Sequence, residues 1–439
     1  MKRYVLVFGL VVFPAVAASA PGTIVVEPGD KLEDVLVPAN AGRRILVRKG
    51  TYPVTRPLVV PDGVTLEGEG VMTYGADGLP AGFAPGTQTL LVDALGLGVS
   101  ADILTLGDGV KLARLAVESE VEVATPGVPF FVPSLIQVPS RGVGDAVTAS
   151  IDECELFNRN GGGIEPRGPT GRALNIVTLN TASGPHEGAS ISVSMTRSII
   201  RSPRNIYGIG AINFAPNADV ELRLEENVVG GGLNATAGVS RPAQVTGSTV
   251  TVHSSDNFYG SRAPDPLTNF GFRLHGGSSP PVGFPTPIPA TTDNALRLHS
   301  MRDRIEGAFI GVYASSGARN LVPPAAATSD RNQVDLQLLG TSIRAVLADF
   351  WLLGAEATQP GVYPGEENHL RVLMRGVTGS CYGVTGTCQR TQRYFDAVGP
   401  TGVLPAGSNR LEIVGSPDSF ADENQGIVPP PGANFFTND

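Results

Sequence analysis

A phrase of alternating apolar and polar residues recurs along the chain and limits the folds open to it. In Ala218–Leu233 the sequence ADVELRLEENVVGGGL alternates, turns at Asn227 and ends in glycines. Similar phrases occupy Ser248–Gly260 and Ala295–Gly307, and weaker copies begin at Ile191, Gln333, His369 and Arg410. Period-2 alternation is typical of strands with one buried face, and its repetition predicts a solenoid in which each coil stacks on the last.

The composition agrees with an all-β solenoid. The chain has 439 residues, with 55 Gly, 36 Pro and few helix-period segments, so many short strands separated by turns are expected. Equivalent apolar positions are Val193, Leu222, Val252, Leu298, Leu336, Val372 and Ile413. Their spacing runs from 29 to 46 residues, which predicts a loop excursion in every coil.

The two ends of the chain differ from the repeats. Residues 1–18 read as a secretory signal peptide, with Lys2 and Arg3 before an apolar run, so we expect a secreted or periplasmic protein. Asp30 and Glu33 have the spacing of a capping box and predict a short helical cap over the first coil. The predicted domains are one solenoid over residues 19–428 and a C-terminal tail over residues 429–439.

Charge and cysteine content bear on partners and on disulfides. The formal net charge is −9, which argues against a nucleic-acid partner. No run after the signal peptide is long and apolar enough for a membrane span, and the oligomeric state stays open. Cys381 and Cys388 flank a short glycine-containing loop and are predicted to form a disulfide in an oxidising compartment. Cys154 is expected to be a small buried hydrophobe.

The segment Arg43–Gly70 carries a family resemblance. Its pattern, I-x-V-x-x-G-x-Y followed by P-L-x-V-P-x-G-V-T-L-x-G-x-G, resembles the first coil of the pectin-lyase-like superfamily of right-handed parallel β-helix proteins. The resemblance implies that fold and the handling of extracellular carbohydrate. It leaves the activity open, because the fold is shared by lyases, hydrolases, esterases and non-catalytic adhesins.

Stacking the coils predicts two outward ladders of side chains on one sheet. The first is Ser192, Glu221, Thr251, Arg297, Asp335, Arg371 and Glu412. The second is Ser194, Arg223, His253, His299, Gln337, Leu373 and Val414. His253 and His299 should be stacked neighbours, and Arg297 should adjoin Asp335.

These ladders supply the candidate catalytic residues. In lyases of the resembled superfamily a base removes a proton next to a uronate carboxylate, which a cation neutralises. His253 or His299 is the candidate base and Arg297 the candidate clamp. Ordinary solvated cross-strand pairs are the competing interpretation.

Further residues are candidates for binding a polysaccharide substrate or a cell-surface glycan. They are Arg223, Asp335, Arg371, and, on a second strand beside a long loop, Arg273 and His275. The positions Asn227, Asn257 and Asp303 form another ladder, which we interpret as structural because turn Asn and Asp tolerate left-handed backbone.

No cofactor or metal motif is present in the sequence. Asp152, Glu153 and Glu155 form an acidic cluster, but alternation splits their faces, so no motif supports a Ca²⁺ site. Two functions stay open. One is an enzyme acting on uronate-containing polysaccharide, a lyase first and a glycoside hydrolase second. The other is a non-catalytic glycan-binding, adhesin-like or envelope protein.

Overall fold

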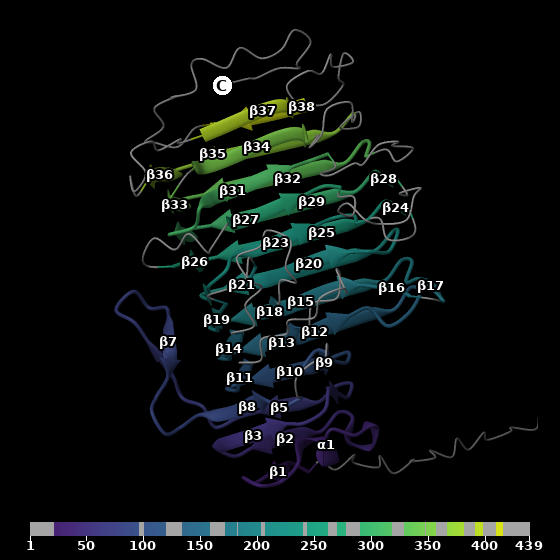
Figure 1. The fold of residues 1–439 in the computed structure, drawn as a ribbon, viewed down its shortest axis with the longest axis vertical. Helices are drawn as coiled ribbons and strands as arrows, with labels where there is room; N and C mark the ends of the chain where they lie inside the picture. The colour runs from purple at the N-terminus through teal and green to yellow at the C-terminus, as the bar shows by residue number, and fades with distance from the viewer. Residues whose placement is uncertain are drawn as a thin grey trace, which may run out of the picture.

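Strands wind around one axis, coil after coil, as Figure 1 shows from the purple N-terminal end to the yellow C-terminal end. The structure is a computed structural model that describes residues 22–95, 101–119, 134–158, 172–181, 183–202, 207–239, 244–261, 270–277, 290–317, 329–346, 348–356, 367–381, 391–397 and 410–415. Three long parallel sheets, named A, B and C here, run the length of the stack. The predicted right-handed parallel β-helix is confirmed.

The strands of the three sheets are given in their hydrogen-bonded order. Sheet A consists of β1 (Ile24–Val26), β2 (Arg44–Val47), β5 (Thr65–Glu67), β10 (Val110–Ala113), β13 (Ala146–Asp152), β18 (Ser190–Thr196), β21 (Asp219–Glu225), β25 (Thr249–Ser255), β29 (Ala295–Met301), β32 (Gln333–Leu339), β35 (His369–Arg375) and β38 (Arg410–Val414). Sheet B consists of β3 (Gly50–Val54), β8 (Thr89–Asp93), β11 (Ala116–Ser119), β14 (Glu155–Asn158), β19 (Ile199–Arg201), β22 (Val228–Val229), β26 (Phe258–Gly260), β30 (Arg304–Glu306), β33 (Ser342–Ala345) and β36 (Thr378–Cys381). Sheet C consists of β4 (Leu58–Val60), β9 (Leu104–Leu106), β12 (Ser134–Pro139), β15 (Arg172–Thr178), β20 (Ile209–Asn213), β23 (Leu233–Thr236), β27 (Phe270–His275), β31 (Ile310–Ser315), β34 (Ala348–Glu356) and β37 (Thr391–Ala397).

Smaller elements lie outside these sheets. They are the helix α1 (Leu32–Val35), the 3-10 turn η1 (Pro38–Asn40), the antiparallel pairs β6 (Met72–Tyr74) with β7 (Pro80–Phe83) and β16 (Asn180–Thr181) with β17 (Gly184–Pro185), and the parallel pair β24 (Val245–Thr246) with β28 (Thr291–Thr292).

The register of sheet A is the one that the repeat predicts. Val193 pairs with Leu222, and each later equivalent pairs with the next, up to Val372 with Ile413. Parallel in-register strands place equivalent side chains in columns. The inward columns of the three sheets therefore merge into one continuous core that runs from Val26 to Ile413.

The predicted helical cap is a single turn, α1, and its Leu32 is buried in the core. The predicted capping box is wrong, because the N-cap residue is Lys31 and it makes no side-chain capping hydrogen bond. The carboxylate of Asp30 instead accepts the backbone N–H of Glu27 at 2.9 Å and closes the turn before the helix.

The turn between sheets A and B contains the predicted ladder of Asn227, Asn257 and Asp303. The Oδ1 of Asn257 accepts the backbone N–H of Asn227 at 2.8 Å, and the Oδ1 of Asp303 accepts that of Asn257 at 2.9 Å. The amide groups also donate inward, from Asn227 to the Met195 carbonyl and from Asn257 to the Leu224 carbonyl. All three ladder side chains are buried.

The left-handed residue of this turn stands one position before the ladder residue. The angle φ is 54° at Glu226, 56° at Asp256 and 55° at Arg302. The expectation that the ladder residues themselves adopt this conformation is therefore wrong. The side chains of Asp256 and Arg302 point to solvent and form a double hydrogen bond, with distances of 2.8 and 2.6 Å.

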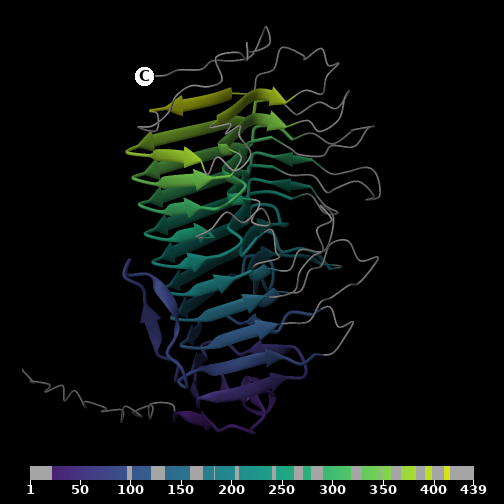
Figure 2. The same cartoon turned by 60° about the vertical axis from the view of Figure 1, so that its left-hand side comes forward.

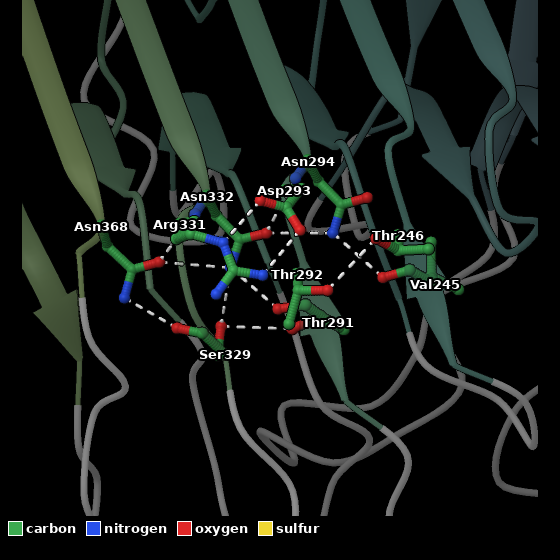
Figure 3. A network of polar contacts seen from close by, with 10 residues as sticks. All are labelled: Val245, Thr246, Thr291, Thr292, Asp293, Asn294, Ser329, Arg331, Asn332 and Asn368. Carbon is green, nitrogen blue, oxygen red and sulfur yellow. Dashed lines mark hydrogen bonds and ion pairs between the residues drawn. The ribbon is translucent and has the colours of Figure 1, made fainter.

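A second ladder, absent from the sequence predictions, stands at the entry to the sheet A strands (Figure 3). The backbone N–H of Asn294 donates to Asn332 Oδ1 at 3.2 Å, and that of Asn332 donates to Asn368 Oδ1 at 3.0 Å. The amide of Asn368 donates to the Ser329 carbonyl at 2.7 Å. Buried ladders thus lie at both ends of strands in sheet A, one before the strands begin and one after they end.

A hairpin of β6 and β7 leaves the early coils and extends along the stack beside sheet B (Figure 2). Tyr74 Oη donates to Glu153 Oε1 at 2.7 Å, and Arg304 Nη2 donates to Asp77 Oδ2 at 2.8 Å. Arg304 lies on β30 and is 227 positions from Asp77 in the sequence. Between these contacts the outward Phe258 of sheet B is buried. The hairpin therefore connects coils that are not neighbours.

Several predictions fall outside the described residues, namely the signal peptide, the C-terminal tail over residues 429–439, and Cys388 with the disulfide to Cys381. The prediction for Cys154 is confirmed, since its side chain is buried and free. Burial raises the pKa of the Cys154 thiol to about 12.

Candidate functional site

Sheet A carries the predicted histidine pair on its outer face. His253 on β25 pairs with His299 on β29, which confirms the predicted register. The two imidazole rings are stacked, with centroids 5.2 Å apart and planes 9° from parallel. The His253 side chain is 47% exposed, so the pair stands on an open surface.

The charges nearest to His253 come from the preceding strand, β21. Glu221 Oε1 accepts a hydrogen bond from Arg223 Nη2 at 2.7 Å and lies 3.8 Å from His253 Nε2. Burial lowers the pKa of His253, and the neighbouring His299 lowers it further, while Glu221 acts in the opposite direction. His253 is therefore neutral at neutral pH, the form in which imidazole accepts a proton.

Arg223 is the register neighbour of His253, and Arg297 lies two positions before His299 on the same strand, but the remaining predicted residues of sheet A lie farther away. Arg297 and Asp335 are register neighbours, but among the described side chains no ion pair within 4.0 Å joins them. Arg371 lies 3.6 Å from Glu412. It is three strands away from His253, about 14 Å at the usual strand spacing. These residues form a row along an open face.

A surface hollow of about 390 Å³ adjoins this face at the start of β29 and β32. Its lining residues are Asp293, Asn294, Ala295, Arg331, Gln333 and Glu367. Asp293 and Arg331 form two hydrogen bonds, of 2.7 and 2.8 Å, and this contact lowers the pKa of Asp293. Because these two charges neutralise each other, we assign no ligand to the hollow.

The two remaining predicted site residues lie on the outer face of sheet C. Arg273 and His275 alternate along β27 with Phe272 and Leu274, whose side chains are in the core. His275 is nevertheless only 3% exposed, so the expectation of a solvent-facing histidine is wrong. Its ring packs 5.4 Å from the ring of Tyr313 on the next strand.

Arg273 belongs to a row of outward positions that the register connects from coil to coil. This sheet C row consists of Gln137, Asn175, Gly210, Asn234, Arg273, Tyr313 and Trp351. It changes along the stack from amides to a cation and then to aromatic rings. Unlike the open ladders of sheet A, most of the row is buried or half-buried.

Aromatic rings surround the guanidinium of Arg273. Its Cζ lies 5.2 Å from the ring centroid of Tyr207 and 5.4 Å from that of Phe270. The Phe270 and Tyr313 rings meet edge to face at 5.4 Å, and the Trp351 ring follows 6.3 Å from Tyr313. Such a surface combines a cation that binds carboxylates with flat apolar faces against which sugar rings pack.

The polar start of the sheet C row was not among the sequence predictions. Arg172 Nη1 donates to Asn175 Oδ1 at 2.7 Å, and Asn234 is 6% exposed. A signal for them does exist in the sequence. Asn175 and Asn234 are polar residues within otherwise apolar strands, at positions equivalent to Arg273.

The acidic cluster considered for Ca²⁺ is divided among other partners. Asp152 pairs with Arg197 at 2.8 Å and Glu155 with Arg201 at 3.0 Å, while Glu153 accepts the hydroxyl of a tyrosine. Within the described ranges, no group of three or more His, Cys, Asp or Glu side chains is placed to hold a metal ion. In the same part of the chain, no helix has the length and apolar character needed to cross a membrane.

Comparison with known proteins finds structural similarity only. No protein-family model matches the sequence, and no curated protein matches it significantly. A GH87 α-1,3-glucanase catalytic unit from Streptomyces thermodiastaticus is 15% identical with a TM-score of 0.31, and the match covers 86% of this chain and 69% of that one. A family 28 exopolygalacturonase from Yersinia enterocolitica is 10% identical with a TM-score of 0.23, over 87% and 79% of the two chains. A periplasmic alginate epimerase is 11% identical with a TM-score of 0.18, over 86% and 85%.

At these TM-scores the similarity adds no argument about function. The fold rests on the register of the three sheets, and the function must be argued from the site itself.

Proposed function

We propose that the protein is exported and handles carbohydrate outside the cell, binding a uronate-containing polysaccharide on the sheet C row. The observation that supports this most directly is the guanidinium of Arg273 beside the stacked rings of Tyr207 and Phe270. Guanidinium groups bind carboxylates through two parallel hydrogen bonds. Trp351, which is half-buried, follows beyond the buried Tyr313. The half-buried side chains of Arg273, Phe270 and Trp351 are therefore the ones that a chain of sugar rings would contact.

The experiment uses Trp351, which is the only tryptophan in the protein. Titration with oligogalacturonate is expected to change the intrinsic fluorescence of the wild type. Arg273→Ala should weaken binding roughly tenfold or more, because a charge-assisted contact is lost. Arg375→Ala, which removes an exposed arginine from the end of a sheet A strand, is the matched control and should bind like the wild type. If Arg273→Ala bound oligogalacturonate as tightly as the control variant does, the proposal would be contradicted.

A second candidate function is β-elimination on sheet A, and the lowered pKa of His253 favours it. Neutral His253, with His299 stacked on it, takes the proton from the carbon next to the uronate carboxylate, which Arg297 neutralises. The electron pair forms a carbon–carbon double bond as the glycosidic oxygen leaves and acquires a proton. The product absorbs in the ultraviolet.

Activity assays separate the two candidates. A lyase on sheet A predicts ultraviolet absorbance that is lost in His253→Ala and His299→Ala but kept in Arg273→Ala. New reducing ends without that absorbance would indicate hydrolysis and would contradict the elimination. Binding to the sheet C row without either product would leave a non-catalytic glycan-binding protein.

A further inference from the structure

The buried guanidinium of Arg172 lies at the polar start of the sheet C row. Arg172 is the first residue of β15, and its Nη1 donates to Asn175 Oδ1 at 2.7 Å. Its Nε is buried and makes no hydrogen bond. Burial lowers the pKa of Arg172 to about 10, which still leaves the group fully charged at neutral pH.

In the described part of the chain, no carboxylate neutralises this charge. Among the described residues no acidic side chain forms an ion pair with Arg172 within 4.0 Å, and burial alone accounts for the direction of its pKa shift. A buried charge without a counter-charge is strongly unfavourable. Such a group is stabilised when an anion binds beside it.

The neighbouring positions leave room for that charge. Gly210, on the next strand, faces the Arg172 side chain so closely that an added Cβ would lie 2.6 Å from Arg172 Cδ. One strand further lies the buried Asn234. Its Oδ1 can only accept hydrogen bonds, but its Nδ2 carries two N–H donors, which are the groups an anion requires. Arg172 as a whole is half-buried, whereas Asn175 and Asn234 are buried, so an anion reaches this site from the side of Arg172.

We infer that Arg172 and Asn234, on either side of Gly210, form an anion site that takes an oxyanion carried by the saccharide, a carboxylate or a sulfate. The inference rests on the proposed binding of a polysaccharide to the sheet C row. Gly210 and Arg273 are separated by two strand steps, about 10 Å at the usual spacing. The ligand therefore carries at least two negative charges, repeated along its length, and lies parallel to the axis of the stack.

Two variants test the site in the full-length protein. Arg172→Met removes the charge at similar volume, and Gly210→Ala keeps the charge but displaces the side chain that carries it. Both should weaken oligogalacturonate binding roughly tenfold or more, as followed by Trp351 fluorescence. Arg375→Met, at the exposed end of β35 in sheet A, is the matched charge control. Oligogalacturonate and a sulfated oligosaccharide compare the two oxyanions. A neutral oligosaccharide shows how much of the binding comes from the sugar rings alone.

The outcomes separate this inference from the proposed function. Wild-type affinity of Arg172→Met, together with lost binding in Arg273→Ala, would overturn the anion site and keep the saccharide site. Inorganic sulfate, which has no sugar, is the third probe. A thermal shift by sulfate that depends on Arg172, without binding of any saccharide, would keep the anion site and overturn the proposed function. Absence of every Arg172-dependent effect would refute the inference.

Discussion

Replacing Asp303 by asparagine is expected to stabilise the protein at neutral pH. Asp303 occupies a buried ladder position in which the two preceding coils have asparagine. Its Oδ1 accepts the backbone N–H and the side-chain amide of Asn257 at 2.9 and 3.1 Å, and its Oδ2 accepts Ser300 Oγ at 2.6 Å. Burial raises the pKa of the Asp303 carboxyl against the opposing effect of these hydrogen bonds. The ionised form is therefore unfavourable in the folded state.

The magnitude follows from what the substitution keeps and what it adds. An amide at position 303 keeps the Oδ1 acceptor and removes the desolvated charge, whose effect is about 1.4 kcal/mol for each unit of pKa shift. Asn257 donates to the carbonyl of Leu224, which is the residue paired with Ser254 on the preceding strand. The new amide N–H of residue 303 is expected to donate in this way to the Ser254 carbonyl. That bond contributes about 1 kcal/mol, while Ser300 loses a charged acceptor of similar value. Because these two hydrogen-bond effects nearly cancel, we expect Asp303→Asn to raise the free energy of unfolding at pH 7 by the cost of the desolvated charge that it removes.

The pH dependence gives the sharper test. Because the folded-state pKa of Asp303 is raised, the protonated carboxyl contributes its full stability below the unfolded-state pKa of about 3.9. That contribution is lost as the pH rises through the folded-state pKa. The advantage of Asp303→Asn should thus be small in acid and increase towards neutral pH. Urea unfolding at several pH values measures the difference in the free energy of unfolding between variant and wild type. The reverse substitution in the ladder, Asn257→Asp, should destabilise the protein increasingly as the pH rises. A gain that does not change with pH, or a loss at pH 7, would refute the reasoning.

Two further substitutions test contacts described above. Asp77→Asn should lower the free energy of unfolding by only about 0.5 kcal/mol, because its ion pair with Arg304 is partly exposed. A double-mutant cycle with Arg304→Gln should give a coupling energy of that size. A coupling energy of zero would contradict the contact. Gly232→Ala should abolish folding or destabilise by more than 3 kcal/mol, since φ is 69° and the added Cβ would lie 2.1 Å from the Phe270 carbonyl oxygen. Gly188→Ala, with φ of 68° and its nearest atom at 3.9 Å, is the control for backbone strain alone and should lose about 1–2 kcal/mol in thermal unfolding.

The register of sheet A was predictable because only one of its faces is buried. In β21 the inward Val220, Leu222 and Leu224 alternate with polar residues, so the period of two is visible in the sequence. That alternation fixed which side chains are neighbours from coil to coil, including the stacked His253 and His299. It carried no information on whether such neighbours form a functional site.

Sheet C was less predictable because both of its faces are buried. Every residue of β31, Ile310–Ser315, is buried, which leaves no alternation from which to assign the outward positions. For the same reason, the sequence does not show that Arg172 and Asn234 lie on the same outward row. The role of Gly210 depends on a side chain that reaches it from another strand. The left-handed residues before the ladder, such as Glu226 and Arg302, also lack a sequence signal, since they are neither Gly nor Asn.

The hairpin of β6 and β7 imposes a delay on the folding of this solenoid during synthesis. In a solenoid held only by neighbouring coils, each coil is completed when the next one stacks on it. Asp77 must wait for 227 further residues before Arg304 becomes available, roughly 10 to 45 seconds at ordinary rates of translation. Until then the hairpin is fixed to the stack only by contacts with earlier coils, such as that of Tyr74 with Glu153. The turn of the hairpin, which carries Asp77, is therefore the last part of the early coils to be fixed in place.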